Sequence, residues 1–356
     1  MNNDHFAIIP FERKETWDEL VKTFPQHDIY YLTGYVDAFR LHGDGEPILI
    51  HYKNGHVQGI CVYMKRDIAN EPWAAGLEKN ACFDLITPYG YGGFIFKGEP
   101  SATDIKTFYS EYCIYMSDSN ILAAFTRWHP MLNNAELLKG VSNVIDLGKT
   151  IHIDTTTEEL IMQNILSKDR CTIRKATKNG IEIHCSEDWG IFPKFIDIYN
   201  KTMEKDNAHA YYYFEEAFYR SVVENLKGKF KVFYAVYNEE IIAASIILFC
   251  NGQVHYHLSG SVSEYRNLNP SNLLLYEVAV WASHNGYKSF HLGGGIGSQQ
   301  DLLFKFKQSF NKNSGNQFSI SKEVFNREAY DKLVELRRVN DKSFNPESSF
   351  FPLYRS

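Results

Sequence analysis

One pattern occurs twice in this sequence, 185 residues apart, and it limits the folds that the chain can adopt. Each copy has two apolar runs joined by a short turn: 48–52 (ILIHY) and 57–64 (VQGICVYM) around Asn54-Gly55, then 233–237 (FYAVY) and 242–249 (IAASIILF) around 238–240. Such a pattern predicts a β-hairpin. The two copies match in length without a gap, which aligns Tyr52 with Tyr237 and predicts two related hairpins.

The elements after each hairpin also repeat in order. A Gly-containing apolar run, a helix and a further strand are expected at 84–96, 101–116 and 121–128 in the first half, and at 254–260, 270–285 and 289–292 in the second. Pro270 suits a first helical position, and Asn285-Gly286 ends that helix. The shared order predicts a duplicated α/β (α+β mixed-sheet) domain. We expect one domain over residues 1–150 and another over 151–356, the second with a C-terminal extension.

Composition excludes several functional classes. The net charge of the 356 residues is −6, which argues against a general DNA binder. The longest apolar run, 241–250, is about half of what a membrane-spanning helix needs. Six dispersed cysteines without a CxxC pair predict reduced thiols and no metal site, and no secretory segment opens the sequence. We therefore expect a cytoplasmic globular protein without a transmembrane segment.

Several segments together resemble a known family. They are 84–93 (DLITPYGYGG), 170–183 (RCTIRKATKNGIEI), 270–295 (PSNLLLYEVAVWASHNGYKSFHLGGG), 303–311 (LFKFKQSFN) and 348–355 (SSFFPLYR). Their order and spacing are similar to those of the FemAB/FemX-like tandem GNAT acyltransferases, whose best-known members transfer amino acids from aminoacyl-tRNA to peptidoglycan precursors. The resemblance implies two GNAT-like domains and a transferase with no tightly bound cofactor, whose donor is aminoacyl-tRNA or acyl-CoA.

Two departures from that family bear on the donor. No long heptad pattern predicts the helical arm of the larger relatives, which argues against contact with a tRNA body. In ordinary acetyl-CoA enzymes of the superfamily, an Arg/Gln-x-x-Gly-x-Gly/Ala loop binds the pyrophosphate. Here the equivalent residues 266–271 read RNLNPS, and the larger side chains keep that loop from approaching a pyrophosphate closely.

Basic residues supply the first candidate site. Arg170 and Arg174 are spaced to share one helix face, with Lys175 beside them. The pattern alone fits a solvated basic face equally well, but the resemblance implies that this segment binds the diphosphate of an acceptor. Lys307 matches the Phe-Lys pair of the family and is expected to stabilise the oxyanion or guide the acceptor, with Phe306 shielding it from water.

Three further interpretations concern the chemistry. Asp84 precedes a Gly-rich strand end and is a candidate to take a proton from the attacking amine, although a turn carboxylate explains it too. Tyr256, expected to face away from His255 and His257 on a strand, is a candidate acid for the leaving group. The segment around Tyr89, Tyr91 and Gly92 is a candidate substrate-binding loop, because glycines allow close approach of the backbone.

We thus predict transfer of an aminoacyl or acyl group to an amine of a cell-envelope precursor, namely a nucleotide-linked or lipid-linked muropeptide. The protein itself is expected to be at most peripherally associated with the membrane. One alternative is an acyl-CoA-dependent N-acyltransferase that acts on a sugar amine or amino acid of a surface polysaccharide. Another is a non-catalytic ligand-binding module, in which a desolvated lysine at position 307 would have no use.

Overall fold

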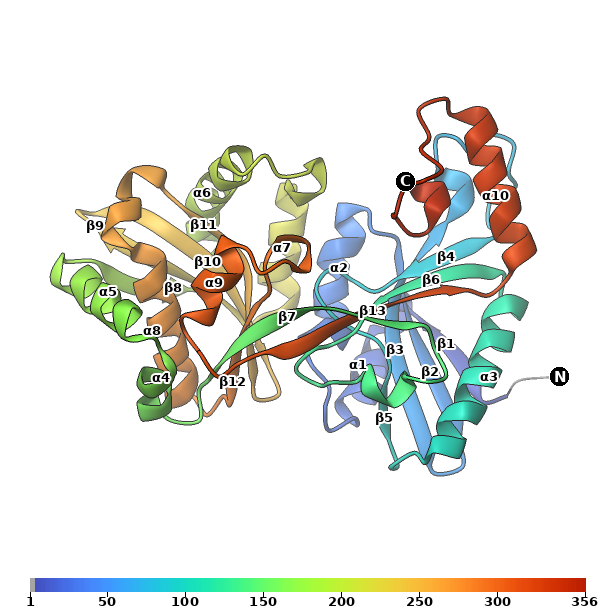
Figure 1. Cartoon of the computed structure of the whole chain (residues 1–356), viewed down its shortest axis with the longest axis horizontal. Coiled ribbons are helices and arrows are strands. Elements are labelled where there is room, and N and C mark those ends of the chain that lie inside the picture. The colour runs from blue at the N-terminus through green and yellow to red at the C-terminus, as the bar shows by residue number, and fades with distance from the viewer. Residues whose placement is uncertain (1–3) are drawn as a thin grey trace. The chain divides into compact units, whose positions relative to one another are not determined.

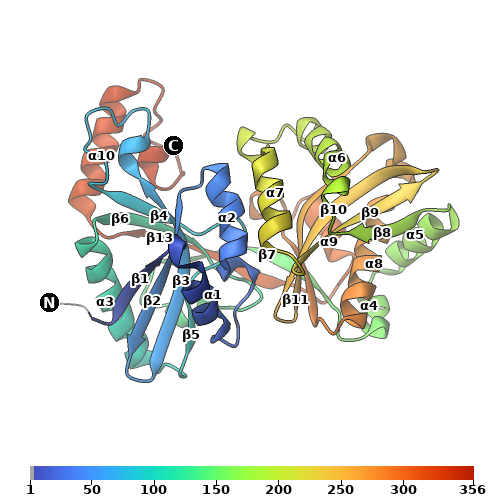
Figure 2. The same ribbon diagram turned by 180° about the vertical axis from the view of Figure 1, so that it is seen from behind.

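The chain divides into two compact units in a computed structural model that describes residues 4–356 (Figures 1 and 2). The first unit contains the residues up to Leu147 together with Phe318–Ser356, and the second is Gly148–Gln317. Among the helices of residues 4–356, none is both long and apolar enough to cross a bilayer.

The first unit is built on a mixed sheet with strand order β1-β2-β3-β4-β6-β13, and β5 pairs with β3. Neighbours are antiparallel except β4 and β6, which are parallel and joined through α3. Ser101 caps α3 in a reciprocal capping box with Asp104. The elements are β1 (Phe6–Pro10), α1 (Lys14–Lys22), α2 (Thr33–His42), β2 (Glu46–Asn54), β3 (Val57–Asp67), β4 (Phe83–Ile86), β5 (Ile95–Lys97), α3 (Ala102–Asp118), β6 (Ile121–Arg127), β13 (Asn316–Val324) and α10 (Arg327–Asn340).

The second unit repeats this arrangement with the order β8-β9-β10-β11-β12-β7. Its neighbours are again antiparallel except one pair, β11 and β12, which are parallel and joined through α8. The elements are β7 (Val144–Asp154), α4 (Glu158–Asn164), α5 (Ser167–Lys178), β8 (Glu182–Ser186), α6 (Phe192–Lys205), α7 (Glu216–Asn225), β9 (Phe230–Tyr237), β10 (Glu240–Cys250), β11 (Gln253–Ser261), α8 (Pro270–His284), β12 (Ser289–Gly293) and α9 (Leu302–Gln308).

The predicted duplication is therefore confirmed in strand order and direction, but the predicted alignment of Tyr52 with Tyr237 is wrong. The pairs that close the two turns are Asn54 with Val57 and Tyr237 with Glu240, so Asn54 is the counterpart of Tyr237. Both turns have two central residues, and Asn238 and Glu239 both adopt positive φ, as tight hairpin turns require. A β-bulge between Ile241 and Ala243 shifts the later residues of β10 by one position, toward the predicted alignment of the two hairpins.

In the sequence, the last strand of each sheet comes directly after the strands of the other sheet. β7, which comes after β6, pairs with β12 of the second unit, whereas β13, which comes after β12, pairs with β6 of the first. Residues 318–356 thus belong to the first unit, which corrects the expectation that they extend the second domain. The reason is packing, because Tyr330, Leu333 and Tyr354 are buried in one apolar cluster with Ile68 and Trp73 of the first unit.

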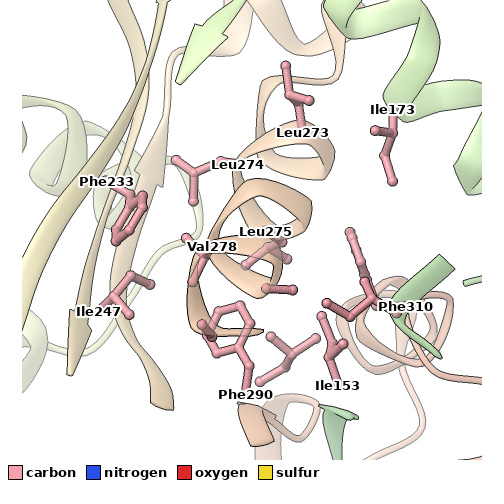
Figure 3. Close-up of a cluster of buried hydrophobic side chains, with 14 of the residues drawn as sticks. Ile153, Ile173, Phe233, Ile247, Leu273, Leu274, Leu275, Val278, Phe290 and Phe310 are labelled. Carbon is pink, nitrogen blue, oxygen red and sulfur yellow. The ribbon is translucent and has the colours of Figure 1, made fainter. Parts of the chain in front are cut away.

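Helices cover both faces of the second sheet, because its strands are apolar on both sides. On β9, Phe230 contacts Phe192 at the start of α6, while Phe233 contacts Trp281 of α8. The core on the α8 side includes Leu274, Val278 and Phe290, and it extends to Ile161, Ile165, Ile173, Phe304 and Phe310 of α4, α5 and the α9 region (Figure 3). In consequence α4, α5, α8 and α9 lie on one face of this sheet, and α6 lies on the other (Figures 1 and 2).

Candidate functional site

The parallel strands β11 and β12 part after a short paired stretch. Their register covers only Gln253–His255 opposite Ser289–His291, although β11 runs on to Ser261. In the first unit, by contrast, the equivalent strand β4 is paired with β6 along its whole length. Substrates of open α/β sheets bind at the carboxyl ends of parallel strands. The second unit therefore has a stretch of β11 backbone that β12 does not cover, and the first has no equivalent.

A β-bulge lies where the two strands part. Opposite Ile246 and Ile247 of β10 stand Leu258 and Tyr256, which makes His257 the extra residue of β11. The expected alternation of His255, Tyr256 and His257 is wrong for this reason, since a bulge interrupts the two-residue period of a strand. Burial, and secondarily His255, lowers the pKa of His257 to about 3, so this imidazole is neutral near pH 7.

Tyr256 lies at the first position of β11 beyond the paired stretch. Its ring packs on the apolar core, with its centroid 6.5 Å from that of Phe290. Burial raises the pKa of Tyr256, while a hydrogen bond with Ser259 opposes the rise. The hydroxyl therefore stays protonated near neutral pH, and it is a weaker proton donor than a solvated tyrosine. The role of Tyr256 as the acid for a leaving group stays a prediction.

Lys307 projects from the buried face of α9. It is 8% exposed, and its Nζ donates to the carbonyl oxygen of Gly294 over 2.7 Å. Gly294 directly follows β12, so the ammonium group lies at the end of β12 that has parted from β11. Desolvation lowers the pKa of Lys307 to about 8, although Asp301 opposes this shift. The side chain is thus a charged but incompletely solvated donor at pH 7.

The glycine-rich segment 293–297 is folded around Asp301, a residue that was not among those predicted from the sequence. The carboxylate of Asp301 accepts from the backbone N–H of Phe304 at 2.7 Å, which caps α9, and from that of Ile296 at 3.0 Å. A Cβ atom on Gly295 would collide with this carboxylate. The signal in the sequence was an aspartate directly before a helix start. Asp301 therefore fixes both the loop that carries Gly294 and the helix that carries Lys307.

The basic residues of α5 have two kinds of environment. The Nη1 atom of Arg170 donates to the carbonyl oxygens of Met162 and Ile165, at 3.0 and 2.8 Å, and so holds the end of α4 against α5. Arg174 and Lys175 are exposed. Phe306 is partly buried against the core, next to Lys307 in sequence. Diphosphate binding by Arg170, Arg174 and Lys175 stays a prediction, and Arg170 also has a structural function.

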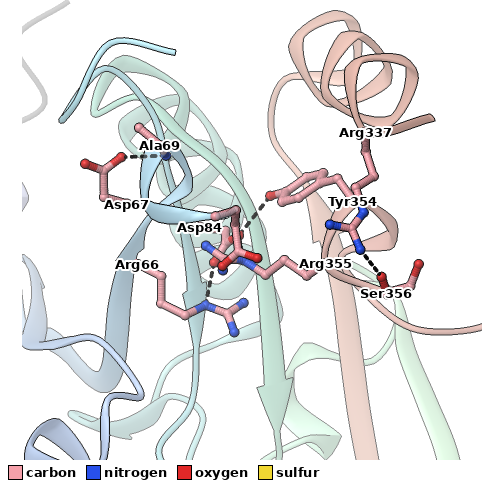
Figure 4. Close-up of polar contacts among 9 residues, drawn as sticks. Arg66, Asp67, Ala69, Asp84, Arg337, Tyr354, Arg355 and Ser356 are labelled. Carbon is pink, nitrogen blue, oxygen red and sulfur yellow. Dashed lines mark hydrogen bonds and ion pairs between the residues drawn. The ribbon is translucent and has the colours of Figure 1, made fainter. Parts of the chain in front are cut away.

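The structure gives Asp84 a structural function instead of the expected catalytic one. Asp84 is fully buried at the start of β4 (Figure 4). Its Oδ1 pairs with Nε of Arg66 at 2.7 Å, and its Oδ2 pairs with Nε of Arg355 at 2.6 Å and accepts from the Tyr354 hydroxyl at 3.0 Å. Both oxygens are thus engaged by charged or hydroxyl donors. A carboxylate in this position fastens the C-terminal segment to the first sheet and is not accessible to an amine.

The loop after β4 is packed by side chains of its own unit. A Cβ atom on Gly90 would lie 2.6 Å from the Tyr30 ring, and one on Gly93 would collide with the Trp128 ring. Tyr89 stacks on Phe39, and Tyr91 makes an edge contact with Tyr30. The N–H of Gly92 donates to the carbonyl of Arg127 at 2.8 Å. Aromatic packing therefore explains these glycines, and substrate binding by Tyr89, Tyr91 and Gly92 stays a prediction.

Comparison with known proteins agrees with this geometry. Residues 166–307 match the family described as "Acetyltransferase (GNAT) domain". The matched residues lie within the second unit. The crystal structure of FemX superposes with a TM-score of 0.64 at 12% identity, covering 92% of this chain and 99% of that chain. The predicted FemX-like fold is confirmed, and the GNAT domain supports the predicted acyltransferase class.

Other solved structures share the fold. The C-terminal domain of a putative lysylphosphatidylglycerol synthetase from Agrobacterium fabrum has a TM-score of 0.52 at 13% identity, covering 92% of this chain and 96% of that chain. A protein of unknown function from Bacteroides thetaiotaomicron has a TM-score of 0.53 at 9% identity, with coverages of 89% and 99%. A search of curated protein sequences finds no significant match. At these identities the similarity shows the fold alone.

Proposed function

We propose that this protein transfers an aminoacyl or acyl group from an activated ester to an amine of a cell-envelope precursor, such as a nucleotide-linked or lipid-linked muropeptide. The observation that carries the proposal is the position of Lys307, whose buried ammonium group lies where β11 and β12 part. A charge in so poorly solvated a position is unfavourable for folding, and such groups are concentrated at functional sites. The FemX-like fold supports an envelope precursor as the acceptor class.

The protein must position the amine beside the ester, stabilise the oxyanion and supply a proton to the leaving oxygen. The acceptor amine attacks the carbonyl carbon of the donor ester, and the carbonyl oxygen becomes an oxyanion in the tetrahedral intermediate. Lys307 and backbone N–H groups of β11 beyond His255 stabilise that oxyanion as preorganised donors. The C–O bond of the ester then breaks, and the leaving oxygen takes a proton, for which Tyr256 is the nearest candidate on β11. The amine loses its proton to solvent or to the substrate, since Asp84 is not accessible.

The first turn of α8 favours an aminoacyl ester over a CoA thioester as the donor. In acetyl-CoA enzymes the pyrophosphate binds at this helix start, where free N–H groups attract anions. Here Asn272, in the first turn of α8, donates from its Nδ2 to the carboxylate of Asp169 at 3.1 Å. A carboxylate beside the helix start repels a pyrophosphate. Both donor classes are made in the cytoplasm, so the proposal includes a cytoplasmic location.

Mass spectrometry of the acceptor tests the proposal. The purified protein is incubated with nucleotide-linked or lipid-linked muropeptides and with aminoacyl-tRNA or acyl-CoA, and an added aminoacyl or acyl mass is expected on an amine. The Lys307→Met variant should lose this product, whereas Lys205→Met, which changes an exposed lysine on α6, should retain it. Product on a sugar amine with acyl-CoA alone would favour the polysaccharide N-acyltransferase. Substrate binding without any product would favour the non-catalytic module.

A further inference from the structure

The exposed apolar side chains of the second unit are gathered in one region. Among the large apolar residues of Gly148–Gln317, four are exposed, and all four belong to α9, to the loop before it or to the junction of α4 and α5. Their exposed fractions are 42% for Leu166, 72% for Ile296, 83% for Leu302 and 38% for Leu303. Single exposed leucines are ordinary, but several in one region indicate a binding surface.

Hydrogen bonds hold these residues near one another. Ile296 donates its N–H to the carboxylate of Asp301, the residue before Leu302, at 3.0 Å. Leu166 donates its N–H to the carbonyl of Ser309, directly after α9, at 2.8 Å. Since α9 has only seven residues, both of its ends lie close together. We call the surface formed by Leu166, Ile296, Leu302 and Leu303 the α9 surface.

Packing of the core does not account for the α9 surface. Phe304 and Lys307 form the inner face of α9, and Phe304 already belongs to the apolar core of the unit. Leu302 starts the helix on the opposite side and Leu303 lies at the edge of the inner face, where it is still 38% exposed, so polar residues would serve folding equally well at both positions. Their apolar area is therefore available to a partner outside the chain.

The charge around the α9 surface identifies the chemistry of that partner. Lys168, Lys305 and Lys312 are exposed. Lys168 is two residues from Leu166, and the backbone N–H of Lys312 donates to the carbonyl of Asn164. The segment 302–312 contains no acidic residue. Asp301, directly before it, is acidic, but its carboxylate accepts from the backbone N–H groups of Ile296 and Phe304, and Asp169 of α5 accepts from Asn272. The chain as a whole has a net charge of −6, so this basic surround is local.

We propose that the α9 surface docks on an anionic lipid bilayer. Apolar side chains that enter the interface, ringed by lysines that meet anionic headgroups, are the combination by which peripheral proteins bind membranes. A nucleic acid would also attract the lysines, but it would leave the four apolar side chains without contacts. Docking does not depend on acyl transfer. If the proposed function also holds, docking brings α9, with Lys307 on its inner face, to the membrane and favours a lipid-linked acceptor.

Sedimentation with vesicles tests docking without any substrate. The full chain is mixed with phosphatidylcholine vesicles containing or lacking 30% phosphatidylglycerol, at low salt and at 0.5 M salt. We expect binding to the anionic vesicles that weakens with salt. The Leu302→Ser/Leu303→Ser variant should bind at least tenfold more weakly. Lys168→Gln/Lys312→Gln should lose about fivefold for each lysine. The control Leu41→Ser/Leu137→Ser changes two residues of the first unit that are each 46% exposed, and it should bind like the wild type.

Three outcomes would overturn the proposal. One is equal binding to both kinds of vesicle, and another is unchanged binding by the Leu302→Ser/Leu303→Ser variant with a native circular dichroism spectrum. The third is retention of tRNA by the lysines with no vesicle binding, which would assign the surface to nucleic acid. Because catalysis is not measured, a failure of docking leaves the proposed transfer reaction intact, and a failure of the transfer assay leaves docking intact.

Discussion

Replacing Lys307 by Met removes a buried charge and keeps most of the side-chain volume. Burial lowers the pKa of Lys307 from 10.5 to about 8. At 1.36 kcal/mol per unit, the charged form costs about 3 kcal/mol of folding free energy below pH 8. The variant does not have this cost, but it leaves the Gly294 carbonyl without its donor, which lowers the free energy of unfolding by about 1–3 kcal/mol. We expect Lys307→Met to be as stable as the wild type at pH 7, or more stable by up to about 2 kcal/mol.

The pH dependence separates these contributions. Between pH 8 and 10.5 the folded wild type has lost the Lys307 proton while the unfolded chain retains it, so the free energy of unfolding of the wild type rises with pH relative to that of the variant. Urea denaturation at pH 7 and pH 10.5 measures the difference, which should move by about 3 kcal/mol in favour of the wild type. Turnover should fall at least a hundredfold in the variant, as for loss of an oxyanion donor, and in the wild type it should decline above about pH 8.

Lys305→Met is the matched control, because Lys305 lies on the same helix but is exposed. It should not raise the free energy of unfolding at pH 7, because the Lys305 side chain is already exposed to solvent. The reasoning would be refuted if Lys307→Met were several kcal/mol less stable than the wild type at every pH, because Lys307 would then be a structural donor to Gly294. Unchanged turnover in a folded Lys307→Met variant would remove this residue from the mechanism.

Three further predictions concern residues that the structure places away from the chemistry. Asp84→Asn should lower the free energy of unfolding by about 3–5 kcal/mol in urea melts, because the part-buried Arg66 loses its carboxylate partner and Arg355 loses one of its two; an unchanged melt would contradict the network. Arg170→Gln should destabilise the protein by about 1–2 kcal/mol, whereas Arg174→Gln should be neutral in the same melts, and equal effects would assign both to the solvated face. Gly93→Ala should destabilise by at least about 1 kcal/mol in thermal melts, since position 93 has φ of 84° and abuts a tryptophan ring; a neutral result would show that the ring can move.

Local patterns were sufficient for the elements and for the duplication. The helix from Pro270 begins and ends within one residue of the predicted bounds, since its proline start and Asn-Gly end act within a few residues. The hairpins could be predicted for the same reason, although the predicted alignment of one hairpin with the other is wrong by two residues. No periodicity signals a bulge, because the extra residue is accommodated by pairing with a neighbouring strand.

The fold class, the hairpins and Lys307 as a residue of interest could be predicted from the sequence, since they follow from short-range pattern and from family resemblance. The tertiary structure was needed to show that Asp84 is held between Arg66 and Arg355, residues far apart in sequence. It also decided that β13 completes the first sheet and that β11 and β12 part after His255. Strand exchange, ion-pair networks and the burial that shifts the pKa of Lys307 all arise from contacts between distant segments, which have no signature in any local window of sequence.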